Sequence, residues 1–384
     1  MSNQFHFTSE QVSHGHPDKM CDYVSDALVD AHLAQDPYSA VAIETLLKNN
    51  TVIVAGEIKS KANIDFESVI RSALSDVGYT DAETGFDHKT CIITLLIDKQ
   101  SMEIANSVHE GKKDEEIGAG DQGLMIGYAS NECEEMLPLT LVYATKLITE
   151  LNKARKDGSI DWLMPDAKSQ VTLLYEKEQD GSIKPVKVET VLVSTQHKKG
   201  VSNEEIAKTV REKIINKVIP AKFLTDETKY FINPSSMFTI GGPKADAGVT
   251  GRKIIADTYG GWGGHGGGAF SGKDPTKVDR SGAYAARWIA KSLVANNYCK
   301  RCIVQISYGI GITHPVSIYI DTHGTVKEGM TDADLVTLVM KSFDLRPGII
   351  IRDLKLRQPI YKEICLYNHF MPKKNALWEI PKKF

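Results

Sequence analysis

The feature that most constrains the fold is a pattern of predicted elements that recurs three times along the 384-residue chain. Each copy reads helix, strand, strand, helix, strand, judged from the spacing of apolar residues and from the turn residues between strands. Units of this kind bury their helices against a mostly antiparallel sheet. The sequence therefore predicts an α+β protein of three similar domains related by repetition.

The expected elements can be given by their residue ranges. The expected helices are 17–35, 65–77, 139–155, 203–218, 275–295 and 332–343. The expected strands are 40–47, 51–58, 91–97, 169–176, 185–195, 230–233, 302–308, 316–321 and 349–352. Asp274 is the expected cap of the fifth helix, with Pro275 at its first position. The stretches 100–120 and 233–273 fall outside the pattern, and long irregular segments are often functional.

Composition is that of an ordinary globular protein. Hydrophobic residues make up 42%, charged residues 25%, and the net charge is −3, which gives no support for binding to nucleic acid or to an anionic membrane. Apolar runs are far shorter than the ~20 residues of a membrane helix. The first residues show no signal-peptide pattern and the six cysteines are widely spaced, so we expect a cytoplasmic protein. The lone pair Cys299 and Cys302 favours burial at a strand start over a zinc or redox site.

The segment 241–280 is the most informative part of the sequence. Eight of the thirteen residues from Gly260 to Gly272 are glycine, and their bare amides could approach phosphate oxygens closely. Cations that neutralise phosphate alternate here with carboxylates that hold its magnesium. These charged residues are Asp246, Arg252, Lys253, Asp257, Lys273, Asp274, Lys277, Asp279 and Arg280. The alternative is a flexible glycine linker with solvated charges.

Two familiar nucleotide-binding patterns occur in this segment without their structural context. Residues 261–266 fit G-x-G-x-x-G, but no βαβ unit surrounds them, which disfavours a dinucleotide-binding fold. Residues 267–273 fit G-x-x-x-x-G-K, but Asp274 follows where a P-loop needs Ser or Thr for magnesium. Phosphate binding outside a P-loop remains the favoured interpretation.

Three shorter polar segments are candidates for the same site. Residues 13–19 place two histidines, an aspartate and a lysine at a helix start, where a merely capped helix is the alternative. Residues 118–128 hold an Asp-Gln pair flanked by glycines, which fits a structural turn equally well. Residues 165–169 set an acid and a base two positions apart, suited to a ribose and a phosphate or to a plain surface pair.

Taken together, these segments resemble the S-adenosylmethionine synthetase (methionine adenosyltransferase) family, and more closely its eukaryotic branch. The resemblance rests on 118–128 and 266–274, supported in order by 16–19, 56–58, 165–168 and 251–253. It covers about residues 5–381, and the family's three-domain α+β fold agrees with the threefold repeat. It implies domains at 1–101, 118–234 and 235–384, with a mobile lid loop at 102–117.

The resemblance implies an enzyme that makes S-adenosylmethionine and also splits tripolyphosphate. The methionine sulfur would attack the ribose 5′ carbon of ATP in line, and the whole triphosphate would leave before being hydrolysed to pyrophosphate and phosphate. A neutral thioether needs no general base, so catalysis rests on alignment and on stabilising the departing polyanion. Implied cofactors are two Mg²⁺ per site and one K⁺ per subunit. A homo-oligomer is also implied, with a dimer or a dimer of dimers forming the site between subunits.

The resemblance assigns roles to matching positions of this chain. The catalytic groups holding the triphosphate would be His16, Lys168, Arg252, Lys253 and Lys273. Further ATP-binding residues would be Asp166, Asp246, Ala269 and the adenine-stacking Phe238. Methionine would be held by Glu57, Gln100, Asp246 and Lys277. Asp18 and Asp279 would ligate magnesium, and Glu44 would contribute to the potassium site.

Several positions depart from the family pattern. Met102 and Glu103 stand where the lid usually carries Pro-Asp, and Met237 replaces a usual arginine before the adenine-stacking residue. His14 and Met164 also differ, and residues 367–373 lack the expected glycines. The altered lid keeps open a nucleotide-binding regulatory homologue that forms no product. Another ATP-dependent kinase or ligase is disfavoured by the missing motifs.

Overall fold

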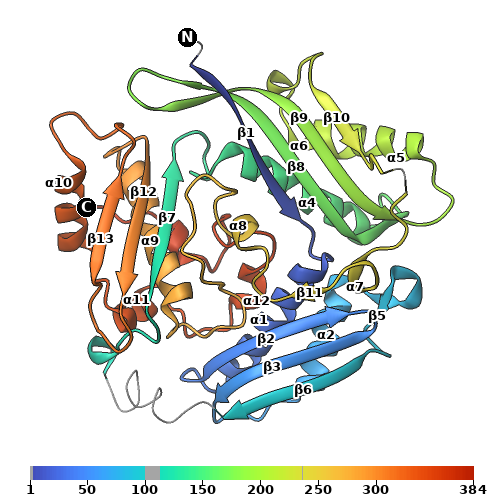
Figure 1. The fold of residues 1–384 in the computed structure, drawn as a ribbon, viewed down its shortest axis with the longest axis horizontal. Coiled ribbons are helices and arrows are strands. Elements are labelled where there is room, and N and C mark those ends of the chain that lie inside the picture. The colour runs from blue at the N-terminus through green and yellow to red at the C-terminus, as the bar shows by residue number, and fades with distance from the viewer. Residues whose placement is uncertain (1–2, 100–112, 236) are drawn as a thin grey trace.

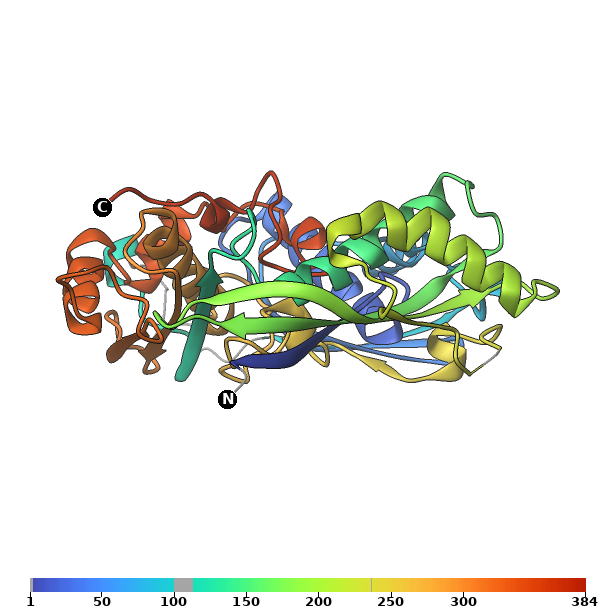
Figure 2. The ribbon, with the colours of Figure 1, turned by 90° about the horizontal axis from the view of Figure 1, so that it is seen from above.

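Three sheets backed by helices form the framework of the protein (Figure 1). The structure, a computed structural model, describes residues 3–99, 113–235 and 237–384. Seen from above, the strands lie toward one face of the molecule and most helices toward the other (Figure 2). This is the predicted α+β architecture. Among the helices of the described ranges, none combines the length and apolarity needed to cross a bilayer.

The first sheet has the strand order β11-β2-β3-β6. Its strands are β2 (Ala40–Lys48), β3 (Thr51–Lys59), β6 (Ile92–Lys99) and the short β11 (Gly248–Val249). Helices α1 (Pro17–Gln35) and α2 (Phe66–Val77) cover one face, and β3 and β6 run parallel. Along β2, Val41, Ile43 and Leu47 are buried beneath α1, so alternate residues of this strand point to the opposite face.

The second sheet has the order β1-β8-β9-β10. It comprises β1 (Gln4–Val12), β8 (Leu163–Lys177), β9 (Ile183–His197) and β10 (Lys229–Ile232). Helix α4 (Leu139–Lys156) packs on β1 and β8. Helices α5 (Asn203–Val210) and α6 (Asn216–Val218) are joined by a π-helical turn, Arg211–Ile215, so the single helix expected over 203–218 is interrupted.

The third sheet has the order β13-β12-β7. It comprises β7 (Gly123–Ser130), β12 (Arg301–Tyr308) and β13 (Ser317–Asp321), all antiparallel. Helix α9 (Val278–Ala295) packs on β7 and β12, α10 (Asp332–Ser342) on β13, and α11 (Pro347–Asp353) on α9. Smaller elements are β4 (Thr80–Asp81), β5 (Phe86–Asp87), α7 (Gly242–Ala245), α8 (Ile254–Asp257) and α12 (Tyr361–Ile364), with 3-10 turns at Ala82–Thr84, Asp114–Glu116, Ala221–Phe223 and Leu377–Glu379.

Each large sheet takes one edge strand from a distant part of the chain. The N-terminal β1 pairs along its whole length with β8, from Gln4 opposite Glu176 to Val12 opposite Lys168. Strand β7 precedes α4 in sequence but pairs with β12, and β11 pairs with β2. The predicted domain limits remain predictions, and sheet pairing crosses all of them.

Most expected elements are confirmed within a few residues, but the expected strand at 349–352 and the expected helix cap at Asp274 are wrong. The stretch 349–352, expected as a strand, lies inside α11, because Pro347 opens a helix whose Ile349, Ile350 and Ile351 are all buried. Helix α9 begins at Val278 rather than near 275. Asp274 does not cap it, because its carboxylate accepts hydrogen bonds from Val41 N (2.7 Å), Thr276 N (2.9 Å) and Lys277 Nζ (2.5 Å).

The expected burial of the Cys-x-x-Cys pair is confirmed. Cys299 and Cys302 are buried at the start of β12, and all six cysteines are free. In the described part of the chain, no group of three or more His, Cys, Asp or Glu side chains could together hold a metal ion. The pair therefore serves the core of the third sheet.

Arg287 holds the third sheet to the C-terminal segment, and its loss should destabilise the protein. The buried guanidinium donates to both carboxylate oxygens of Glu379 (2.8 and 2.9 Å) and to the carbonyls of Tyr128, Glu135 and Met136. We expect Arg287→Met to lower the free energy of unfolding by about 3–5 kcal/mol, because buried acceptors lose their donors.

Urea unfolding measures this change. Arg346→Met is the control, because the pair between Arg346 and Asp344 lies near the surface and is expected to contribute less than about 1 kcal/mol. Equal destabilisation by the two substitutions would contradict the assigned role of Arg287.

Candidate functional site

A cluster of oppositely charged side chains lies where α1 begins. His16 is in an extended conformation at the N-cap, Pro17 starts the helix, and His16 Nδ1 accepts a hydrogen bond from Asp18 N at 3.2 Å. Asp18 Oδ2 accepts from Lys253 Nζ at 2.5 Å, and Arg252 Nη1 lies 3.9 Å from Asp18 Oδ1. The helix start and the segment after β11 thus bring four of the predicted site residues together.

His16 is neutral at the pH of ordinary assays. Burial, together with the nearby ammonium groups of Lys253 and Lys168, outweighs the opposite effect of the Asp18 carboxylate and lowers the pKa of His16 to about 3. Because Nδ1 accepts the backbone hydrogen bond, the ring proton is carried by Nε2. His16 can therefore donate one hydrogen bond from Nε2 without carrying charge.

Asp18 stays ionised despite its burial. Burial raises its pKa, but hydrogen bonds from Lys253 Nζ and Val249 N outweigh that effect and lower the pKa overall. Because the Asp18 carboxylate stays charged, a metal ion could take the place of the Lys253 or Arg252 side chain beside it. The chemistry of this acid is therefore compatible with the magnesium role that the sequence predicts.

A cavity of about 350 Å³ lies on the first sheet beside this cluster. It is lined by Ala42, Ile43, Glu44, Ala55, Gly56, Glu57, Thr250, Ala269, Ser271 and Lys273. Glu44 and Glu57 come from the outward face of β2 and β3, away from α1. Ser271 Oγ is buried and has no hydrogen-bond partner among the described residues. The cavity thus combines two carboxylates, an ammonium and an unused hydroxyl.

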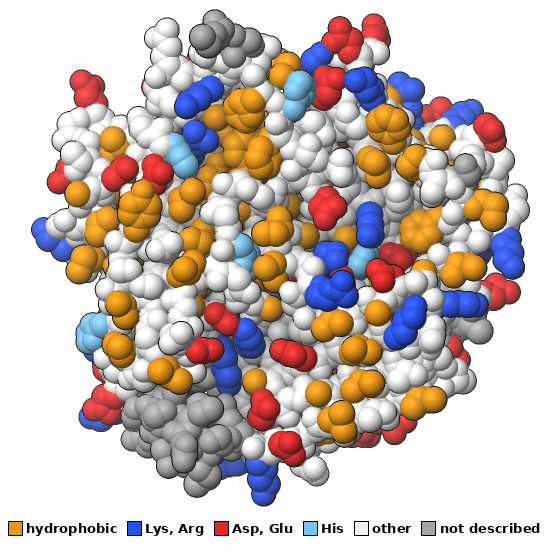
Figure 3. Space-filling view, viewed as in Figure 1, with side chains coloured by type: hydrophobic (Ala, Val, Ile, Leu, Met, Phe, Trp, Pro, Cys, Tyr) orange, Lys and Arg blue, Asp and Glu red, His pale blue; other side chains and the backbone are white. Residues whose placement is uncertain are grey.

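Lys273 connects the cavity with the second predicted magnesium ligand. Its Nζ lies 2.6 Å from Asp279 Oδ2, in the first turn of α9. Lys253 and Lys273 therefore share one arrangement, in which each predicted phosphate-binding lysine is paired with a predicted metal-binding aspartate. Near the middle of the strand face, cationic and acidic side chains lie side by side among apolar ones (Figure 3).

Asp166 forms a third part of the candidate site, on β8. Its Oδ2 accepts from Gly242 N at 2.9 Å, whereas Oδ1 is buried without a hydrogen-bond partner among the described residues. Burial raises the pKa of Asp166 to about 6, and the carboxylate of Asp246 is near enough to contribute. Phe238 is half-buried close by, held by a hydrogen bond from its N–H to His197 Nε2. An unsatisfied buried acceptor is suited to a ligand hydroxyl.

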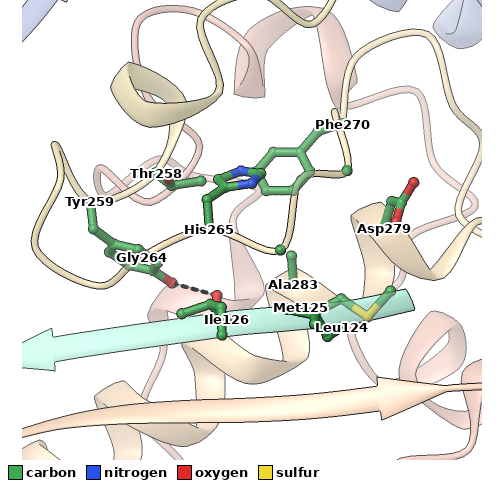
Figure 4. Close-up of a pocket in the computed structure, with 12 residues that line it drawn as sticks. Leu124, Met125, Ile126, Thr258, Tyr259, Gly264, His265, Phe270, Asp279 and Ala283 are labelled. Carbon is green, nitrogen blue, oxygen red and sulfur yellow. Dashed lines mark hydrogen bonds between the residues drawn. The ribbon is translucent and has the colours of Figure 1, made fainter.

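The glycine-rich segment packs tightly against β7 (Figure 4). A side chain at Gly266 would meet the carbonyl oxygen of Leu124 at 1.8 Å, so only glycine allows this approach. The hydroxyl of Tyr259 donates to the carbonyl of Ile126 at 3.4 Å, and His265 lies over Phe270 at 6.2 Å between ring centroids. The segment approaches β7 at Gly266 and the start of α9 at Gly268, where an added side chain would meet Asp279, and it leads directly into Ala269 and Lys273.

Some predicted residues do not join these groups. Lys277 is predicted to hold methionine, but its Nζ pairs with buried Asp274 and it does not line the cavity with Glu57. Gln100, Met102 and Glu103 lie outside the described residues. Met237 is 74% exposed beside Phe238.

The described end of the predicted lid is attached to α11. Ion pairs link Asp114 with Arg357 and Glu115 with Arg352, and Ile117 is buried.

The segment 367–373, where glycines are expected, is held by Asn368. Its amide nitrogen donates to the carbonyls of Ala256 and Thr258.

Sequence reasoning missed a buried ionic layer beneath the site. Lys19 Nζ lies 3.0 Å from Asp22 Oδ2 and 2.5 Å from Asp257 Oδ1, and Asp26 pairs with Arg280. The i, i+4 spacing of Asp18, Asp22 and Asp26 on one helix was a visible signal. Ser271 and Thr250 gave no such signal, because only the fold brings them to the cavity.

The chain matches three family models in succession. They describe the N-terminal domain of S-adenosylmethionine synthetase at residues 4–102, its central domain at 116–238 and its C-terminal domain at 240–380. The chain belongs to the S-adenosylmethionine synthetase family. The predicted family and its three-domain α+β fold are thereby confirmed, and membership implies ATP and methionine as substrates and adenosyl transfer as the activity.

The residues of this family member fit magnesium that arrives with its phosphate. Asp18 and Asp279 each offer one carboxylate, and within the described ranges no group of three or more His, Cys, Asp or Glu side chains could by itself hold a metal ion. Magnesium is commonly held by one or two carboxylates together with substrate phosphates and water. A sparse donor set of this kind suits a metal bound jointly by protein and polyphosphate.

The suppressed basicity of His16 predicts a loss of stability in acid. The unfolded chain binds a proton near pH 6.5, whereas the folded chain does so only near 3, so stability falls as the pH drops through this interval. Between pH 7.5 and 5, wild type should lose about 2 kcal/mol of unfolding free energy more than His16→Gln does.

Urea unfolding at the two pH values measures the difference. His6→Gln is the control, because His6 is largely exposed in β1. A pH dependence that is the same in His16→Gln as in wild type would rule out a buried neutral imidazole at position 16.

Proposed function

We propose that this chain forms S-adenosylmethionine from ATP and L-methionine by in-line attack of sulfur on the ribose 5′ carbon, and then hydrolyses the triphosphate. The observation that carries the proposal is the pair of lysine–aspartate contacts, Lys253 with Asp18 and Lys273 with Asp279, of which Lys273 also lines the cavity on the first sheet. A polyanion and its counter-cation can enter such pairs together, because the lysines can turn to phosphate as the aspartates accept metal.

Each part of the site suits one part of the substrates. Asp166 Oδ1 would accept from the ribose hydroxyls, and Phe238 would stack on adenine. The cavity with Glu44 and Glu57 would take the ammonium group and side chain of methionine. The triphosphate would lie along His16, Arg252, Lys253 and Lys273, with Lys168 nearby.

In this reaction these residues supply charge and align the substrates, and no residue has to abstract a proton. A thioether sulfur has no proton to lose when it attacks. The charge that must be stabilised in the transition state is therefore that on the leaving triphosphate. His16 donates from Nε2 to a phosphoryl oxygen while staying neutral, and Lys253 and Lys273 supply full charges. Magnesium, when bound through Asp18 and Asp279, would neutralise phosphate charge.

The outward face of the first sheet supports a homo-oligomer. Ile92 and Leu96 are 64% and 60% exposed on the outward face of β6, and Leu46 on β2 continues the apolar surface. The cavity opens on the same face of β2 and β3. A second copy packed here would cover the apolar side chains and enclose the site. Potassium near Glu44 and the pairing of dimers belong to the same proposal.

A product assay tests the proposal directly. Purified protein is incubated with ATP, methionine, Mg²⁺ and K⁺, and S-adenosylmethionine, pyrophosphate and phosphate are quantified. We expect equal amounts of the three, and Lys273→Met should abolish their formation while the fold is retained. ATP binding without any product would instead favour the regulatory homologue, and ADP or AMP would indicate a kinase or ligase.

The lysine–aspartate pairs predict that magnesium and tripolyphosphate bind cooperatively. Alone, Mg²⁺ must displace an ammonium from each aspartate, whereas bound polyphosphate attracts the lysines away. We expect tripolyphosphate to strengthen Mg²⁺ binding at least about tenfold, and Mg²⁺ to strengthen tripolyphosphate binding by the same factor.

Isothermal titration with each ligand in the absence and presence of the other measures this coupling. In Asp18→Asn the factor by which each ligand strengthens binding of the other should fall toward one. Independent binding of the two ligands to wild type would show that the pairs do not open together.

A further inference from the structure

Four aspartates lie one turn apart on α1 and form a single acidic stripe. They are Asp18, Asp22, Asp26 and Asp30, and residues four apart share one face of a helix. Each accepts at least one hydrogen bond from a backbone N–H within residues 249–362, at 2.8–2.9 Å. The proposed mechanism uses the first of them, and the rest of the stripe has no part in it.

Asp22 and Asp26 make the same contact with two different loops. Asp22 Oδ1 accepts from Gly251 N at 2.8 Å, and Asp26 Oδ1 accepts from Gly272 N at 2.9 Å. Both glycines have left-handed backbones, with φ of 80° and 84°. In each loop the next residue is a proposed triphosphate ligand, Arg252 or Lys273.

The surroundings of these carboxylates fix them firmly. Both are fully buried. Asp22 is held by Lys19 at 3.0 Å, and Asp26 by the two Nη atoms of Arg280 at 2.8 and 2.7 Å. Arg280 Nη1 also donates to the carbonyl oxygen of Lys273 at 2.9 Å, so both ends of the Gly272–Lys273 unit are held.

Asp30 offers a comparison within the same helix. Its two oxygens accept from Tyr361 N and Lys362 N, both at 2.8 Å, at the start of α12. The bonds are of the same kind, but the residues they hold have no proposed contact with substrate.

We propose that Asp22 and Asp26 are positioning residues for the triphosphate, which aim Arg252 and Lys273 by holding the amide of the glycine before each. The inference rests on the proposed function. One rigid helix thereby sets the spacing of two cations that lie 21 positions apart in the sequence. A carboxylate acceptor is stronger than a neutral one, so both loops are held at defined places before the polyanion arrives.

The test compares Asp22→Asn and Asp26→Asn with the matched control Asp30→Asn in the full-length protein. Tripolyphosphate binding in the presence of Mg²⁺ is measured by isothermal titration, and thermal unfolding is followed alongside. We expect the first two variants to bind about tenfold more weakly, because a misplaced charged hydrogen bond corresponds to about one decade in affinity. Asp30→Asn should bind within about twofold of wild type even where its unfolding temperature falls as much.

A double-mutant cycle between Asp22→Asn and Arg252→Met separates positioning from general destabilisation. If Asp22 acts through Arg252, its replacement should have little further effect on binding once Arg252 is gone. Additive losses in the cycle, or equal losses in all three aspartate variants, would overturn the inference. Where Asp22→Asn does not fold, Asp22→Glu keeps the charge beside Lys19 while moving the acceptor, and normal binding by that variant would also overturn it.

Failure of the inference is distinguishable from failure of the proposed function. Wild-type protein that binds no tripolyphosphate and forms no S-adenosylmethionine refutes the function itself. Wild-type binding and turnover together with unchanged Asp22 and Asp26 variants refutes only the positioning role.

Discussion

The buried pairing of Asp26 with Arg280 is the contact on which the arrangement of the site depends. It joins α1 to α9, two helices separated by more than 240 residues in sequence, with both side chains removed from solvent. The guanidinium also lies 4.0 Å from the ring centroid of Tyr361 and donates from Nε to Tyr284 Oη, so its edge and one face are both engaged. Buried pairs contribute little net stability compared with apolar packing, but breaking one leaves a charge stranded at a cost of about 3–5 kcal/mol. Such a contact selects one geometry above all others.

Much of the fold was accessible from the sequence because its periodicity is strong. Helix α1 was predicted with its observed limits, since Pro17 and the apolar residues at helical spacing mark it clearly. Strand β1 was not predicted, because six of its nine residues are polar and its partner lies more than 150 positions away. No strand is predicted over 123–130, because the glycines there also fit a turn, and α11 lies where three isoleucines favour a strand. In these cases packing against distant elements overrode local preference.

The candidate site can be predicted from the sequence to a similar degree. Polar residues in the segments around His16 and Lys253 could be recognised by type, and the fold gathers them around the Asp18 carboxylate, to which Lys253 donates a hydrogen bond. The orphan acceptor on Asp166 and the hydroxyl of Ser271 could not be foreseen, because being unpaired is a property of the surroundings. Nor did the sequence reveal that Lys277 is occupied by Asp274, since that contact depends on where α9 begins.

The pairing of edge strands with partners far away in sequence affects how the protein folds during synthesis. During synthesis β1 leaves the ribosome some 150 residues before its partner β8, and β7 waits still longer for β12. Until then the nascent chain carries strands with open edges, which invite pairing with other chains. Closure of the third sheet therefore waits for β12, and the three sheets cannot mature one after another as independent units. A chain that stopped before β12 would leave β7 without its partner strand.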